Sequence, residues 1–183
     1  MNKNKKLFVM FSIFLILMLF SNIFGVTNFK PKYGITKTNV NFRSNPSKIV
    51  YTIKKNNKIK IVGTLDKYYI VQSEKNYVGL INKSFITISN KKSNTLSYTS
   101  ILKYSAVTKS NTNVRRGPGE HYTKINNLKK NTKVTVIGKI KDFNLVIYDT
   151  NKIGMIKSSL LTNETNNITN NTTNNIIIIK KEY

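Results

Sequence analysis

The sequence predicts an all-β protein that contains two small tandem domains. The first observation is an internal repeat, because residues 39–47 read NVNFRSNPS and residues 111–119 read NTNVRRGPG. After a three-residue insertion in the second copy, the match resumes at an offset of 75 residues, with IKKNNKIKIVG at 53–63 over LKKNTKVTVIG at 128–138. The second observation is a two-residue hydrophobic period within each copy, which is typical of half-buried strands.

The strands follow in order along each copy. Ile59 and Ile61 alternate with lysines in the first copy, and Val134 and Val136 alternate with polar residues in the second. Five or six short strands in about 55 residues, without a helical period, imply a small barrel or a two-sheet sandwich. Two further strand pairs, each joined by a short polar turn, are expected at 68–72 with 77–81 and at 143–148 with 152–156.

Glycine and asparagine mark special backbone positions in both copies. Gly79 and Gly154 lie inside expected strands, where glycine predicts a bulge or a sharp bend. Asn56 and Asn131 end Lys-Lys-Asn turns, and asparagine tolerates the left-handed conformation that such turns need.

The N-terminus is interpreted as an export signal. Residues 1–6 carry three lysines and no acid, and residues 7–20 are apolar except for Ser12, as in the charged and apolar regions of a secretory signal. Counted as far as Val26, the apolar stretch is long enough for a helix that spans a bilayer. We therefore predict that residues 1–26 form a signal peptide or an N-terminal membrane anchor, with the body of the chain outside the cytoplasm.

The remaining sequence divides into four predicted segments: a first domain at 33–89, a linker at 90–104, a second domain at 105–161 and an Asn/Thr-rich low-complexity tail at 162–183. The tail cannot bury a core and is interpreted as a flexible spacer. Since a spacer normally leads to another domain, one hypothesis is that the chain is a truncated relative of a longer protein.

The composition indicates a strongly basic surface. Lys and Arg number 31 against 7 Asp and Glu, which gives a formal net charge of +24. Only three of the basic residues are arginine, and Lys, Asn and Ile all have A/T-rich codons, so genome composition is an alternative origin of the charge. Whatever its origin, this charge attracts anionic polymers in a salt-dependent way. Scattered lysines behind an export signal argue against nucleic acid as the partner.

The rare residue types argue against an enzyme. The chain has no cysteine and one histidine, which excludes thiol catalysis, disulfides and metal sites built from several histidines. His121 is interpreted as a solvated loop residue, and the acids lie scattered in turns without a close pair that repeats in both copies. We expect no catalytic residue, no cofactor and no bound metal.

The two repeats resemble bacterial SH3 (SH3b) domains. NFRSNPS and NVRRGPG are similar to the Asn-Val-Arg-x-Gly-Pro run that opens this family, and the Lys-Lys-Asn turn and the Gly-hydrophobic ending are similar to the rest of its pattern. The similarity covers 35–86 and 107–161. It implies two tandem small SH3-like β-barrels after an N-terminal hydrophobic helix. It also implies binding to cell-wall peptidoglycan, as in domains that target an attached wall hydrolase.

The repeats depart from the family pattern at its tryptophans. The central-strand tryptophan is replaced by Tyr68 and Phe143, and the tryptophan after the strand glycine is replaced by Leu80 and Met155. These substitutes keep the packing apolar, but Phe, Leu and Met lack a polar group for a ligand.

The resemblance and the aromatic and arginine content suggest candidate ligand-binding residues. Arg43 and Arg115 follow the signature asparagine, and the alternative is that they pin the long first loop. Arg116 is interpreted as an exposed group able to bind a carboxylate or phosphate. The full set is Tyr68, Tyr69, Arg116, Phe143, Arg43 and Arg115.

These features together predict an exported, non-catalytic protein that binds or targets the cell wall. Its expected partners are peptidoglycan or anionic wall polymers, and the membrane if the N-terminal segment is not cleaved. Two alternatives are an adaptor that binds a protein of the envelope and a truncated remnant of a wall hydrolase carrying SH3 repeats.

Overall fold

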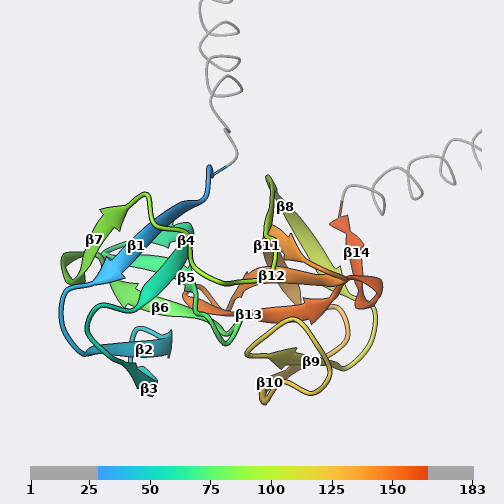
Figure 1. Ribbon diagram of the computed structural model, residues 1–183. Coiled ribbons are helices and arrows are strands. Elements are labelled where there is room, and N and C mark those ends of the chain that lie inside the picture. The colour runs from blue at the N-terminus through green and yellow to red at the C-terminus, as the bar shows by residue number, and fades with distance from the viewer. Residues whose placement is uncertain (1–28, 165–183) are drawn as a thin grey trace, which may run out of the picture.

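The computed structural model describes residues 29–164 and is all-β, which confirms the predicted class. It contains two seven-stranded antiparallel sheets that lie side by side (Figure 1). The predicted N-terminal hydrophobic helix and most of the predicted tail lie outside the described residues. Among the residues described, no helix is long and apolar enough to cross a membrane.

Each sheet is formed by one of the two repeats. The first sheet contains β1 (Lys32–Thr36), β2 (Val40–Asn45), β3 (Lys48–Ile53), β4 (Lys58–Leu65), β5 (Tyr68–Gln72), β6 (Val78–Asn82) and β7 (Ile86–Ser89), with the 3-10 turn η1 (Lys83–Phe85) before β7. The second contains β8 (Thr99–Thr108), β9 (Thr112–Arg115), β10 (Lys124–Leu128), β11 (Lys133–Ile140), β12 (Phe143–Tyr148), β13 (Lys152–Lys157) and β14 (Leu161–Asn163), with η2 (Ser158–Leu160) before β14.

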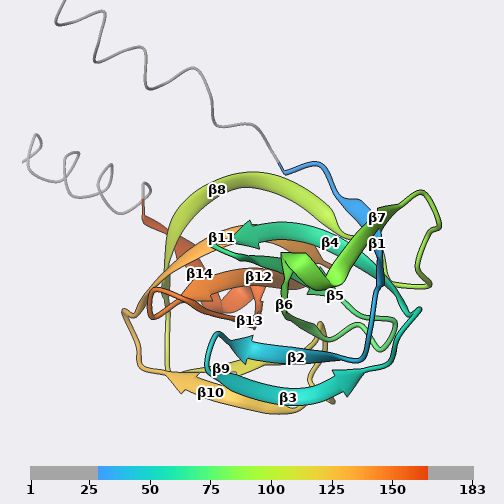
Figure 2. The same ribbon diagram turned by 90° about the vertical axis from the view of Figure 1, so that its left-hand side faces the viewer.

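The strand order is the same in both sheets. The first runs β3-β2-β6-β5-β4-β1-β7 and the second runs β10-β9-β13-β12-β11-β8-β14. The expectation of closed barrels is wrong, because β3 and β7 form the edges of the first sheet and no ladder of the described residues joins them; β10 and β14 form the edges of the second. The β2–β3 and β9–β10 ribbons lie at the same edge of the molecule in both views (Figures 1 and 2).

Each sheet curves around its own apolar core. The alternating strands behave as predicted, because Ile59, Ile61 and Val136 are fully buried and Val134 is nearly so. The first core consists of Val40, Phe42, Ile53, Ile59, Ile61, Val71, Ile81 and Ile86. The second core consists of Ala106, Val114, Leu128, Val134, Val136, Val146, Tyr148, Ile156 and Leu161.

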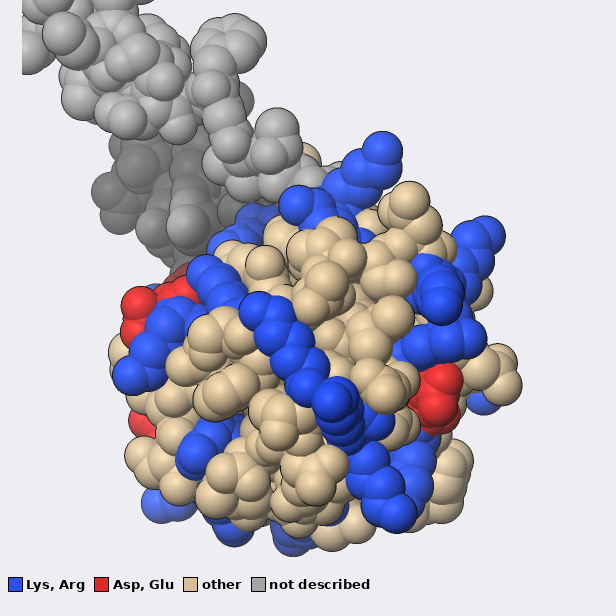
Figure 3. All heavy atoms as spheres, turned by 60° about the vertical axis from the view of Figure 1, so that its left-hand side comes forward, with Lys and Arg blue, Asp and Glu red and all other residues tan. Residues whose placement is uncertain are grey.

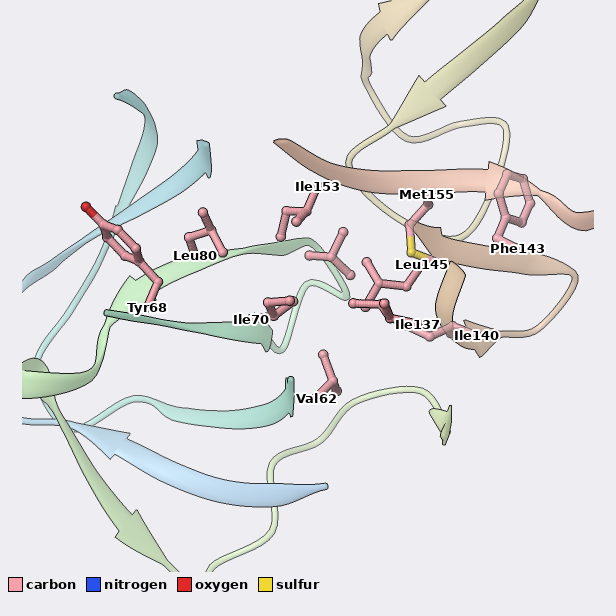
Figure 4. Close-up of a cluster of buried hydrophobic side chains, with 11 residues drawn as sticks. Val62, Tyr68, Ile70, Leu80, Ile137, Ile140, Phe143, Leu145, Ile153 and Met155 are labelled. Carbon is pink, nitrogen blue, oxygen red and sulfur yellow. The ribbon is translucent and has the colours of Figure 1, made fainter. Parts of the chain in front are cut away.

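A third apolar cluster joins the two units (Figure 4). It forms where side chains on the outer face of β4–β6 meet side chains on the outer face of β11–β13. The central strands are therefore buried on both faces, one against their own core and one against the other unit. The members of this interface cluster are Val62, Tyr68, Ile70, Val78, Leu80, Ile137, Ile140, Phe143, Leu145, Ile153 and Met155.

The segment between the units packs against this interface. Leu96 and Tyr98 contact the interface cluster, and the Tyr98 hydroxyl donates a hydrogen bond of 2.8 Å to the carbonyl of Ile137. The carbonyl of Leu96 accepts a 2.8 Å hydrogen bond from the buried amine of Lys60. Burial lowers the pKa of that amine. Strand β8 begins at Thr99, within the range expected to be linker.

The predicted left-handed asparagines are confirmed, since Asn56 and Asn131 both have φ of 64°. A buried threonine holds each of these turns. Thr36 donates from Oγ1 to the carbonyl of Lys54 at 2.7 Å, and Thr108 donates to the carbonyl of Lys129 at 2.6 Å. The repeat therefore preserves a hydrogen-bonded clamp as well as a hydrophobic pattern.

Replacing Thr36 with valine is expected to lower the free energy of unfolding by about 1–3 kcal/mol, because the Lys54 carbonyl and the Asn57 amide lose their shared hydroxyl partner. Chemical denaturation followed by circular dichroism measures the change. Thr52→Val is the control, because Thr52 is exposed in β3. Equal midpoints for the two variants would contradict the clamp.

Of the two alternatives predicted for Gly79 and Gly154, a bulge or a sharp bend, the bulge is wrong. The register of β5 with β6 and of β12 with β13 is continuous past both glycines, and the register shifts lie between Ile61 and Gly63 and between Val136 and Gly138. Glycine is needed at both positions because another side chain packs directly against the backbone there. A Cβ on Gly79 would collide with the ring of Phe42, and one on Gly154 would collide with Val114.

Candidate functional site

Both units have a cleft at the same place in the fold. The first has a volume of about 160 Å³ and the second about 230 Å³. Their linings correspond through the repeat: a pair of asparagines before and in the second strand, the signature arginine, the aromatic residue that opens the central strand, and a residue of the 3-10 turn. The first is lined by Asn39, Val40, Asn41, Arg43, Tyr68, Asn82 and Phe85, and the second by Asn111, Asn113, Arg115, Glu120, Phe143, Lys157 and Leu160.

The signature arginines line the clefts and also hold the first loop of each unit. Arg43 donates from Nη1 to the carbonyl of Pro46 at 3.2 Å, and Arg115 donates from Nη1 to the carbonyl of Tyr122 at 3.0 Å. Both side chains are half-buried. Both arginines therefore hold the first loop of their unit, as the alternative interpretation predicted. Each arginine also borders the cleft of its unit.

The two clefts differ in charge. In the second, Lys157 and Glu120 form an ion pair of 2.8 Å, and this contact lowers the pKa of Glu120 and raises that of Lys157. Both side chains are exposed to water, so the pair adds little stability. In the first cleft Asn82 stands at the position of Lys157, and its side chain accepts hydrogen bonds from Ser84. The first cleft thus has no acid in its lining.

The candidate aromatic residues do not form one site. Tyr68 is 9% exposed and Phe143 is 3% exposed, and they lie at opposite ends of the interface cluster (Figure 4). The hydroxyl of Tyr68 points away from the cluster, whereas Phe143 has no such group. Tyr69 lies on the other face of β5, packed against the first core, with the amine of Lys83 5.8 Å from its ring.

The two positions where the resemblance predicted a tryptophan after the strand glycine lie at the interface between the units. Leu80 and Met155 are fully buried within the cluster that joins the units. The surface that they would offer to a ligand in a separate unit is covered by the other unit. Apolar side chains without a polar group suit this position, because an interface core has no water to satisfy such a group.

The interpretation of Arg116 as an exposed residue is wrong. Arg116 is half-buried where the two units meet, and its guanidinium carbon lies 5.5 Å from the ring centroid of Tyr77. Its carbonyl accepts a 2.8 Å hydrogen bond from the amide of Val78 in the first unit. These contacts join the second unit to the first, so one isolated repeat does not reveal them.

Sequence reasoning missed several residues at these sites. Phe85, 45% exposed, forms one side of the first cleft, and Asn41 lies beside it. The Asn-x-Asn pattern at 39–41 and 111–113 could have revealed these sites, because it occurs in both repeats and lines the corresponding cleft in each unit. Within residues 29–164, no group of three or more His, Cys, Asp or Glu side chains is placed to hold a metal ion.

Comparison with known proteins gives structural similarity at a low level. No family model matches the sequence, and no curated protein matches it. Among solved structures, NlpC2 from Trichomonas vaginalis is 18% identical with a TM-score of 0.32, and the match covers 75% of this chain and 49% of that one. NlpC1 from the same organism is also 18% identical with a TM-score of 0.32, over 73% of this chain and 46% of that one. A candidate autolysin from Listeria monocytogenes is 15% identical with a TM-score of 0.23, over 73% of this chain and 64% of that one. The chain thus spans about half the length of the first two structures.

Proposed function

We propose that this chain is an exported, non-catalytic protein that binds the peptidoglycan of a cell wall through two SH3-like units. The observation that carries the proposal is the pair of repeat-related clefts, each lined by the same asparagines, arginine and central-strand aromatic position. A lining that recurs at the same place in two diverged copies indicates a shared role in binding. The first cleft is the principal site, because it contains the phenol of Tyr68 and an exposed Phe85.

The chemistry of the first cleft suits a short peptide. Arg43 and the amides of Asn41 and Asn82 offer donors to carbonyl and carboxylate groups, while Phe85 offers apolar contact. The stem and cross-bridge peptides of peptidoglycan combine these groups. The export signal predicted for residues 1–26 supports an encounter outside the cytoplasm.

The surface charge supports attraction to the wall at longer range. The face shown in Figure 3 carries lysine and arginine side chains across most of its width, with acidic side chains only as isolated patches. Wall polymers rich in carboxylate or phosphate attract such a surface, and salt screens this attraction.

Co-sedimentation with peptidoglycan stripped of anionic polymers tests the proposal. The purified chain is expected to remain bound at about 0.5 M salt, where the Debye length is only about 4–5 Å, because a shaped cleft does not depend on long-range charge. Tyr68→Phe should weaken binding by about 2–10-fold through loss of one hydroxyl hydrogen bond.

Tyr104→Phe is the matched control, since Tyr104 is a half-buried tyrosine of β8 outside both clefts. Complete loss of the wild-type chain from the pellet at high salt would overturn the proposal. Equal binding by Tyr68→Phe and Tyr104→Phe would remove the first cleft as the site.

A further inference from the structure

A row of tyrosines crosses the boundary between the two units. Tyr51 comes from β3, Tyr77 from the turn before β6, and Tyr122 from the loop that carries the insertion of the second unit. The ring centroids of Tyr51 and Tyr77 lie 5.8 Å apart, and those of Tyr77 and Tyr122 also lie 5.8 Å apart, both in edge-on contact. All three side chains are half-buried. We call these three residues the junction tyrosines.

The insertion in the second repeat builds this arrangement. It extends the loop after Arg116, and the ring of Tyr122 packs directly on Gly117, where a Cβ would collide with it. The signature Arg115 holds the carbonyl of Tyr122. The insertion therefore has a specific result, which is to bring an aromatic ring of the second unit against Tyr77 of the first.

Arg116 lies among these rings without an acidic partner in residues 29–164. The ion pairs of the described residues involve lysines, and the Arg116 Nε is buried without a hydrogen-bond partner. A guanidinium that stacks on a tyrosine keeps its edge donors in the plane needed for a carboxylate or phosphate. Arg116 also acts on Tyr51: burial raises the pKa of Tyr51, and the Ser73 hydroxyl and the charge of Arg116 partly oppose this.

A basic cleft continues from the junction tyrosines. It has a volume of about 310 Å³ and begins at Tyr51. Its charged lining residues are Lys54, Lys58, Lys75 and Glu74, all exposed, so positive charge exceeds negative charge along it. The lysines of this cleft and Arg116 thus place positive charge on either side of Tyr51 and Tyr77.

Packing of the units accounts for the ring contacts across the junction but leaves the charge of Arg116 without an ion-pair partner among the described residues. The interface cluster already joins the units with apolar side chains. An unpaired cation at an interface costs desolvation without an ion pair in return. A guanidinium beside partly exposed rings offers charged donors to an acidic group and apolar contact to the carbon atoms around it.

We propose that the junction tyrosines, Arg116 and the adjoining basic cleft form a binding site for an acidic saccharide or polyol chain bearing carboxylate or phosphate groups. This inference rests on the proposed wall-binding function and names a second ligand class for it, at a site separate from the paired clefts. The acidic group binds Arg116, the backbone of the polymer lies against Tyr122 and Tyr51, and further acidic groups meet the lysines of the cleft.

Titration calorimetry of the full chain tests the site with three soluble probes. These are a muramic-acid-containing glycan fragment without peptide, a glycerol phosphate oligomer, and an uncharged chitin oligosaccharide of similar length. At least one acidic probe should bind, and the uncharged probe should bind at least about tenfold more weakly. The acidic probe that binds more tightly shows whether the site prefers the carboxylate of a glycan or the phosphate of a polyol chain. Equal affinity for the uncharged probe, or no binding of either acidic probe, overturns the inference.

Arg116→Gln should weaken binding of the acidic probe by about tenfold or more, and Arg116→Lys should recover part of the affinity, because the charge returns without the planar donors. Lys103→Gln is the matched control: it removes one charge from an exposed position in β8, on the opposite side of the molecule from β3 and β10 (Figure 1). Equal affinity of Arg116→Gln and Lys103→Gln for the acidic probe overturns the inference. If Arg116→Gln does not fold, Arg116→Lys is compared with the wild-type chain, and equal affinity of these two proteins overturns the inference.

This experiment separates the inference from the proposed function. If peptidoglycan binding at high salt persists and responds to Tyr68→Phe while the soluble acidic probes do not bind, only the junction site is wrong. If the acidic probes bind through Arg116 while stripped peptidoglycan is not bound, the paired-cleft function is wrong and the junction site stands.

Discussion

Leu80→Asp is expected to lower the free energy of unfolding by about 3–5 kcal/mol and to uncouple the two units, because it places a carboxylate in an apolar interface without a partner. Leu80 is fully buried in the interface cluster, which also contains Ile153 of the second unit (Figure 4). The wild-type chain should unfold in one transition, since each unit buries apolar surface only while the other is folded. Urea denaturation followed by circular dichroism and by tyrosine fluorescence measures both effects.

The control is Leu102→Asp, because Leu102 is a leucine of β8 that is 54% exposed. This variant should change the free energy of unfolding by no more than about 0.5 kcal/mol. Equal midpoints for the two aspartate variants, or two separate transitions in the wild-type chain, would contradict the shared interface.

Gly79→Ala is expected to lower the free energy of unfolding by about 1–3 kcal/mol, despite the addition of only one methyl group. A Cβ at this position would overlap the ring of Phe42 and would lie 2.8 Å from the carbonyl oxygen of Arg43. Phe42 is fully buried and cannot move aside without disturbing the core of the first unit. Thermal and urea denaturation of the variant measure the loss.

Gly63→Ala is the matched control, on strand β4 of the same sheet. Its Cβ would meet no atom closer than the Cδ1 of Ile70 at 3.2 Å, which is the flexible end of a side chain. The loss of stability should therefore be smaller than at Gly79. If Gly63→Ala costs as much as Gly79→Ala, then the glycines are required for backbone reasons and not for the approach of Phe42.

Local features of the sequence predicted much of the fold. The predicted strands at 68–72 and 143–148 coincide with β5 and β12, and the asparagine turns adopt the expected left-handed conformation. These features depend on the period of side chains along a strand and on the φ preference of single residues, which short segments carry by themselves. The repeat seen in the sequence corresponds to two units with the same strand order.

The candidate site was predicted only in part. Tyr68, Phe143, Arg43 and Arg115 do border clefts, but they belong to two separate clefts, and neither cleft is lined by Arg116. A cleft is formed by residues from several strands, and its lining depends on how the sheet curves. The uninterrupted apolar segments YYIV at 68–71 and VGLI at 78–81 were a usable signal that both faces of these strands are buried.

The sequence by itself determined the all-β class, the duplication, the main strands and their turns, because period, turn chemistry and repeat spacing are local properties of the chain. The tertiary structure decided that the sheets are open, that Leu80 and Met155 lie in an interface and that Arg116 is half-buried beside Tyr77. Each of these depends on which face of one unit meets the other. That choice follows from the total apolar area and shape brought together by distant segments, which no single segment specifies.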